Sequence, residues 1–343
     1  MATNSPRRRI PEPEREVIDW LLDSDPSIRW QAMSDFTDAS EEEIAAERAR
    51  VATDSWGAAI LAAQSEDGTW PGEPRFPEWP TLRTLLLLHD MGLDPASEQA
   101  RRAVDRVQEN VKWLMNITQD ELPKDEDISW WHKPLFAGEV EPCINGRVVT
   151  VGAYFGVDMH PLVDRLLGEQ MADGGWNCDQ EIGSTRGSFH TTINVLEGLL
   201  EFEHATGGSP AVKAARERGH EYLLSRHLFK RLSTGEPIEE DRKGGPVWTQ
   251  FSYPAGWRYD ILRGLDYFRN AGVAPDPRMA EAIEIVASGR DRDGRWVLGI
   301  MHPEEVIAEP GITEGSPSRW ITLRALQVLD WYSTMDSRIR RSV

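Results

Sequence analysis

One spacing recurs three times and constrains this chain more than any other feature. In each copy a long polar side chain is followed four residues later by Gly and six residues later by Trp: Gln64, Gly68 and Trp70; Gln170, Gly174 and Trp176; Arg290, Gly294 and Trp296. Each copy follows an amphipathic helical stretch. The Asp-Gly pair predicts a turn in which Gly takes a positive φ, with the Trp folded back over the helix end. The spacing therefore predicts a repeat built from helices.

A second pattern marks helix ends and starts. Helical stretches stop at Gly92, Gly156, Gly208 and Gly272, and a capping residue followed by Pro comes soon after each, at Asp94-Pro95, His160-Pro161, Ser209-Pro210 and Asp276-Pro277. Pro is favoured at the first position of a helix. Asp25-Pro26 is a further start, and Ser40 with Glu43 is a capping box.

Two kinds of helix alternate between these marks. The charged kind is expected at 14–23, 41–64 with a weak point near Asp54, 95–117, 161–171, 210–229 and 277–289. The more apolar kind is expected at 27–37, 80–91, 144–156, 190–205, 257–270 and 319–332. Charged helices belong outside and apolar helices inside. We therefore expect an all-α fold, an (α/α)6 toroid of six inner and six outer helices over 13–335, with tails at 1–12 and 336–343. An open helical solenoid is the alternative, and it would need polar caps at both ends.

Charge and composition exclude several functions. The net charge of −19 opposes a phosphate backbone, so nucleic acid is not an expected partner. No apolar stretch approaches the ~20 residues of a transmembrane helix. Arg7, Arg8 and Arg9 precede Ile10 and a Pro/Glu-rich stretch instead of an apolar segment, which does not fit a secretory signal and predicts a cytoplasmic protein. Two cysteines are too few for a disulfide scaffold.

The spacing from Gln64 to Trp70 and from Gln170 to Trp176 resembles the repeat signature of squalene-hopene and oxidosqualene cyclases. The alternating helices extend this resemblance over most of the chain. It implies an α/α toroid in which the Gln and Trp side chains tie outer helices together. The Asp-x-Asp-Asp acid of those cyclases and the Asp-Asp-x-x-Asp magnesium motif are both absent. The function must therefore be argued from the site.

Protein prenyltransferase β subunits, which are single-domain toroids, bind zinc through an Asp-x-Cys string and a His in a Tyr-His-Thr string. Glu141-Pro142-Cys143 and Phe189-His190-Thr191 are similar to these strings. The resemblance implies a zinc site at the barrel mouth that includes Cys143 and His190, with Glu141 where that family has Asp.

Cys178 lies on the segment that leads to His190, and a toroid would bring it to the same rim as Cys143. Two thiolates and an imidazole suit zinc, with the fourth position left to Glu141, Asp179, water or substrate. Lanthionine cyclases, another toroid family, also use two Cys and one His. Two alternatives stay open: the cysteines pack in the core, or they form a disulfide.

Other candidates lie on loops and at helix starts. Asp127, Trp130, Trp131 and His132 share one loop that could supply catalytic groups and a cation-stabilising wall, or be a solvated connection. Tyr259 and Asp260 are candidate catalytic residues. Two expected inner helices begin with Arg258 and with Arg319 and Trp320, and Arg83 is a similar case near the start of another. These side chains could bind an anionic substrate, or they could make structural pairs.

We therefore expect a zinc-dependent transferase, cyclase or lyase that acts on a small, isoprenoid-like or thiol-containing molecule inside the barrel. The alternatives are a metal-free cyclase with Asp127 or Asp260 as the acid, a non-catalytic protein that binds a hydrophobic ligand, and a carbohydrate-active (α/α)6 enzyme.

Overall fold

The computed structural model describes residues 15–72, 76–113, 132–238, 248–306 and 309–341. These residues form α-helices, short 3-10 helices and loops, and strand pairing among them is limited to isolated bridges such as Lys112 with Pro134. The expected all-α class is confirmed. None of the described helices is both long enough and apolar enough to cross a membrane.

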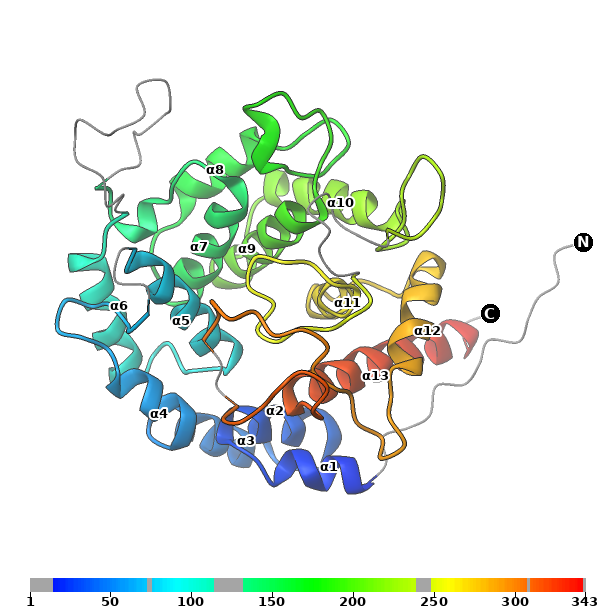
Figure 1. Ribbon diagram of the computed structural model, residues 1–343, viewed down its shortest axis with the longest axis horizontal. Helices are drawn as coiled ribbons and strands as arrows, with labels where there is room; N and C mark the ends of the chain where they lie inside the picture. Colours follow the sequence, from blue (N-terminus) through cyan, green and yellow to red (C-terminus); the bar gives the residue numbers. More distant parts are fainter. Residues whose placement is uncertain (1–14, 73–75, 114–131, 239–247, 307–308, 342–343) are drawn as a thin grey trace, which may run out of the picture.

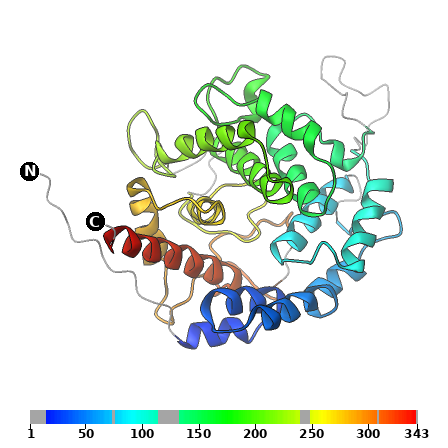
Figure 2. The same ribbon diagram turned by 180° about the vertical axis from the view of Figure 1, so that it is seen from behind.

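The helices alternate along the chain between two sets. One set comprises α1 (Arg15–Leu22), α3 (Glu41–Ala49), α4 (Ser55–Ala62), α6 (Glu98–Asn110), α8 (His160–Gly168), α10 (Pro210–Leu224) and α12 (Ala280–Ser288). The other comprises α2 (Pro26–Phe36), α5 (Glu78–Asp90), α7 (Pro142–Tyr154), α9 (Phe189–Thr206), α11 (Ile261–Asn270) and α13 (Arg319–Arg341). Figure 1 shows α6, α8 and α10 at the periphery and α5, α7, α9 and α11 nearer the middle. The chain runs around the molecule until α13 contacts α2, as both faces show (Figures 1 and 2).

Several helix boundaries differ from expectation. The stretch 41–64 is divided by a 3-10 turn at Arg50–Ala52, because the Asp25 carboxylate accepts the Trp56 N–H (3.0 Å) and draws the start of α4 toward α2. Helix α6 begins only at Glu98, since the Ser97 hydroxyl caps it by accepting the Ala100 N–H. Helix α13 continues to Arg341, through residues expected to belong to a tail.

The recurring Trp performs the same task in all three copies. Its indole N–H donates to the carbonyl ten residues earlier, Trp70 to Ile60, Trp176 to Leu166 and Trp296 to Val286, each at 2.7 Å. The glycine two positions before each Trp has a φ between 82° and 87°. In two copies the Trp backbone N–H also donates to a Thr hydroxyl of the next inner helix, Thr192 and Thr322. Each of those two Trp residues therefore joins an outer helix to the inner helix that follows.

The Gln that opens a copy links neighbouring outer helices. The Gln64 amide donates to the Gly68 carbonyl of its own turn and to the Ala103 carbonyl of α6. Gln170 makes the equivalent pair with Gly174 and with Ala215 of α10. In the third copy the Arg290 guanidinium keeps the bond within its turn, to the Gly294 carbonyl. The repeat is thus a device that holds helices together.

Helices α7 and α9 approach each other through glycine. A Cβ at Gly198 would lie 2.4 Å from the Gly146 carbonyl oxygen, and a Cβ at Gly146 would lie 2.4 Å from the Asn194 carbonyl oxygen. No larger side chain fits this crossing. The contact holds the start of α7, with Cys143, close to the start of α9, with His190 and Thr191.

The Trp repeat predicts a graded loss of stability at Trp176, whose side chain is fully buried. Trp176→Ala should lower the free energy of unfolding by about 3–5 kcal/mol. Trp176→Phe keeps most of the buried apolar area but removes the donor to Leu166, and should cost about 1–3 kcal/mol. Urea unfolding followed by circular dichroism measures both values. Equal stability of the Phe variant and the parent would contradict the assigned role of the indole N–H.

The glycine crossing predicts opposite effects at two helical glycines. Gly198→Ala should destabilise the protein by about 1–3 kcal/mol, because the added methyl group meets backbone. Gly168→Ala on α8 is the matched control: nothing lies within 4 Å of the new Cβ, so it should be neutral or stabilise by up to about 1 kcal/mol. Thermal melting of the two variants tests the contrast, and a similar shift in both would show that the crossing is not tight.

Candidate metal centre and central cavity

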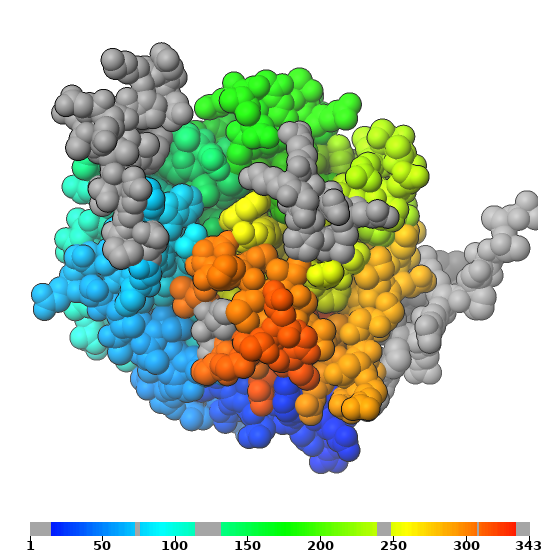
Figure 3. Space-filling view, in the orientation of Figure 1, coloured from blue at the N-terminus to red at the C-terminus, as the bar shows by residue number. Residues whose placement is uncertain are grey.

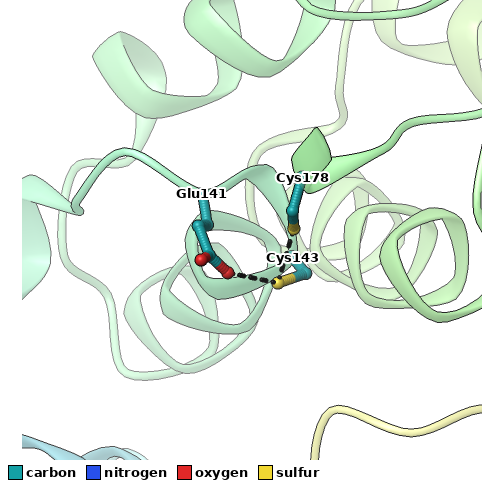
Figure 4. Close-up of side chains that lie close together, drawn as sticks. All are labelled: Glu141, Cys143 and Cys178. Atoms are coloured by element: carbon teal, nitrogen blue, oxygen red, sulfur yellow. Dashed lines mark hydrogen bonds between the residues drawn. The ribbon is translucent and has the colours of Figure 1, made fainter. Parts of the chain in front are cut away.

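Two cysteines and one carboxylate, separated in sequence, converge at the start of α7. The Sγ atoms of Cys143 and Cys178 lie 2.9 Å apart, and Cys143 Sγ lies 3.4 Å from a Glu141 carboxylate oxygen. All the potential ligand atoms of these three residues fall within 4.8 Å of one another. Figure 4 shows the three side chains pointing toward one point, two from α7 and its N-cap and one from the 3-10 helix Cys178–Gln180.

Local hydrogen bonds hold this cluster in place. The buried Glu139 carboxylate accepts the backbone N–H groups of Val140 and Glu141, at 2.6 and 2.9 Å, and so fixes the residues that lead into α7. Before Cys178, the Asn177 side chain accepts the Asp179 N–H and donates to the Arg186 carbonyl. The candidate ligand side chains are therefore positioned by their own loops.

The two thiols are close but are not joined in a disulfide. Both cysteines are free, Cys143 buried and Cys178 half-buried. The hydrogen bond with Cys178, and next the burial of the group, hold the pKa of the Cys143 thiol well above its usual value. Two sulfurs on one tetrahedral zinc lie about 3.8 Å apart, given a Zn–S distance of ~2.3 Å. A side-chain shift of about 1 Å would therefore fit this pair to zinc, and a bound cation would favour the deprotonated thiols.

His190, the expected imidazole ligand, is not part of this group. Its Nδ1 accepts the backbone N–H of Tyr259 at 2.8 Å, and its ring packs edge-on against Trp248 and Trp257. Because Nδ1 accepts a hydrogen bond, the neutral ring carries its proton on Nε2, and neither nitrogen has a lone pair free for a metal. The structure brings Glu141 to the cysteines and leaves His190 outside.

A cavity of about 330 Å³ lies among the inner helices α5, α7, α9, α11 and α13. The segment 252–256 and Glu305 complete its wall. Figure 3 shows the segment between α12 and α13, in orange, spread over the middle of one face of the molecule. Leucines contribute to the lining, but charged side chains from every one of these helices do so as well.

Most of the charged side chains in the cavity pair with one another. Arg263 holds both carboxylate oxygens of Glu197, and Arg324 bonds Asp90 at 2.9 Å and faces Asp266 at 3.6 Å. His89 lies 3.3 Å from Asp90 and 3.4 Å from Glu201. Burial lowers the pKa of His89, but these two carboxylates outweigh it and raise the pKa to about 9. The wall is thus an ion-pair network.

Asp260 and Tyr259 have structural partners. Asp260 caps α11 by accepting the Arg263 N–H at 2.9 Å; it lines the cavity, and burial raises the pKa of its carboxyl. Tyr259 is buried, does not line the cavity, and donates its hydroxyl to the Leu228 carbonyl at 2.8 Å. Of these two predicted catalytic residues, the structure brings only Asp260 to the cavity.

The predicted substrate-binding residues are dispersed. Arg258 pairs with Glu304 at 2.6 Å, and Arg319 faces Glu309 at 3.4 Å and stacks on Trp20. Trp320 is buried and stacks on Tyr253. His132 is exposed and lies away from the cavity lining. Asp127, Trp130 and Trp131 lie outside the described residues.

Sequence reasoning missed most of the cavity's charged residues. Arg147 is the clearest case, because it is a single charge within the otherwise apolar stretch of α7. A lone arginine on a helix that is buried throughout was the available signal. Glu305 offered no such signal, since it lies in a loop whose path is set by tertiary packing.

No family model matches this chain, and no curated protein matches it at a significant level. The site therefore has to be interpreted from its own geometry.

The ion-pair network predicts a pH dependence of stability. Because the pKa of His89 is about 9 in the folded protein and 6.5 ordinarily, its stabilising contribution is complete below pH 6.5 and is lost as the pH rises through about 9. The melting temperature should therefore fall less over this range in His89→Gln than in the parent. His204→Gln is the control, since His204 faces the same Glu201 at 3.9 Å with its side chain 53% exposed. If the melting temperature of His89→Gln falls with pH as steeply as that of the parent, His89 is not the group responsible.

Proposed function

We propose that this protein is a zinc-dependent enzyme that acts on a small polar molecule in its central cavity, with Glu141, Cys143 and Cys178 as zinc ligands. The observation that carries the proposal is the convergence of these three side chains from two separate segments. A fourth position would remain for water or substrate, which is typical of catalytic rather than structural zinc. A zinc ion there would supply Lewis acidity or lower the pKa of a bound water or thiol.

We propose further that the fold is a closed (α/α)6 toroid of the terpenoid cyclase and prenyltransferase type. Contacts between successive inner helices support it, from α5 to α7, α9, α11, α13 and α2. The circuit is completed by hydrogen bonds from α2 to the end of α5, where Trp30 donates to the Met91 carbonyl and Gln31 to the Asp90 carbonyl. An open solenoid would leave α2 and α13 unpaired.

The lining of the cavity supports a polar substrate in preference to an isoprenoid. An apolar ligand would have to be buried against charged groups without replacing their hydration, which is costly. The metal cluster and the cavity are adjacent, because Cys143 and Arg147 are four residues apart on α7 and so share a face.

A metal-free acid mechanism is the second candidate. It is favoured by Asp260, a buried carboxyl in the cavity wall whose pKa is raised by burial. Such a group could donate a proton to a bound substrate. The zinc content of the purified protein separates the two candidates.

Protein purified without chelators should contain about one zinc ion per chain by elemental analysis. Cys143→Ser and Cys178→Ser should each lose most of it, because each removes one of the thiolate ligands. The large helical core should stay folded in both variants, which circular dichroism checks.

His190→Gln is the matched control. His190 is adjacent in sequence to Thr191, whose hydroxyl lies 3.4 Å from Cys178 Sγ, but it does not belong to the cluster. This variant should keep its zinc. Little zinc in the parent, or equal zinc in the parent and Cys143→Ser, would refute the site and favour the acid mechanism. Loss of zinc in His190→Gln would restore the imidazole to the ligand set.

A further inference from the structure

Two arginines in the cavity wall lack the partners that the others have. Arg83 of α5 and Arg147 of α7 both line the cavity, and the Nε of each is buried without a hydrogen bond. Their nearest acid among the described residues is Glu305, at 3.6 Å from Arg83 and 3.9 Å from Arg147. Both distances are within the range of an ion pair but are too long for a hydrogen bond.

The remaining cavity arginines show what a satisfied guanidinium looks like in this protein. Arg263 bonds Glu197, Asn194 and two backbone carbonyls, and Arg324 bonds Asp90. Arg147 is more deeply buried than either, with 3% of its side chain exposed. A guanidinium in such a place ordinarily makes several charge-assisted hydrogen bonds.

These two arginines share a single acid within ion-pair distance among the described residues. That acid is Glu305, whose side chain is also only 3% exposed. Burying an uncompensated charge is costly, and protein sites that do so commonly bind the missing counter-charge. An anionic group beside these arginines would supply the acceptors that their Nε atoms lack.

We propose that Arg83 and Arg147 bind an anionic oxygen group, a carboxylate or a phosphate, of a small molecule held in the central cavity. The planar guanidinium fork suits both groups, since each presents paired oxygens. The inference extends the proposed function: the substrate of the proposed enzyme carries a carboxylate or a phosphate. Its evidence, however, lies in the cavity alone and does not depend on a bound metal.

Isothermal titration of the full-length protein with inorganic phosphate and with succinate, at constant ionic strength in chloride, tests the proposal. At least one anion should bind the parent saturably. Arg147→Gln and Arg83→Gln should each weaken that binding at least tenfold, and Arg147→Lys, which keeps the charge but loses the fork, should fall between. Arg102→Gln, at an exposed arginine of α6, is the control and should bind as the parent does.

Binding of phosphate alone or of succinate alone supports the proposal and identifies the group. Absence of binding of both anions to the parent overturns it, as does parental affinity in both glutamine variants. Circular dichroism checks that each variant is folded, and Arg83→Gln, at the less buried arginine, gives a second reading if Arg147→Gln does not fold.

The same titration of Cys143→Ser separates this inference from the metal proposal. Anion binding should persist in that variant even though zinc is lost. If the parent binds an anion but contains no zinc, the anion site is supported and the zinc proposal is refuted. If the parent contains zinc but binds neither anion, the zinc proposal is supported and the anion site is refuted.

Discussion

The architecture depends on one hydrogen bond, from a buried indole N–H to the last turn of an outer helix. It recurs with the same ten-residue spacing in Trp70, Trp176 and Trp296. A helix end leaves carbonyls without partners, and here a bulky apolar ring both satisfies one of them and covers the end. Because the same Trp backbone reaches the next inner helix in two copies, one residue joins the two layers. Two of the helices that line the cavity, α9 and α13, are tied to the outer layer in this way.

Local sequence signals were sufficient to predict the helices but not the breaks between them. Asp25, Ser40, Ser209 and Asp276 cap helices as expected, because capping needs only a short polar side chain and its neighbours. The break after Ala49 was predicted only as a weak point near Asp54, and its cause is Asp25, far away in sequence. A helix boundary set by a distant residue is invisible to local pattern. The order of the layers could be predicted, whereas their closure into a ring stays a proposal.

The site was partly predictable for the same reason. Cys143 and Cys178 were expected to meet because both precede inner helices, and they do. His190 was expected to join them. It is the second residue of α9, where its ring packs against Trp248 and Trp257 and its Nδ1 accepts the Tyr259 N–H. Sequence register places a residue on a rim without specifying which way its side chain turns. The charged cavity was missed because its pairs, such as Arg324 with Asp90, join helices at opposite ends of the chain.

The glycine crossing of α7 and α9 bears on how a ligand reaches the cavity. Where two backbones touch directly, no side-chain rotamer can change to let the helices slide, so the pair can move only as one body. Cys143 and Arg147 lie on one of these helices, so the part of the cavity wall beside the cysteines belongs to this rigid pair. The part of the wall that can open without separating packed helices is formed by residues 252–256 and Glu305, which lie in loops.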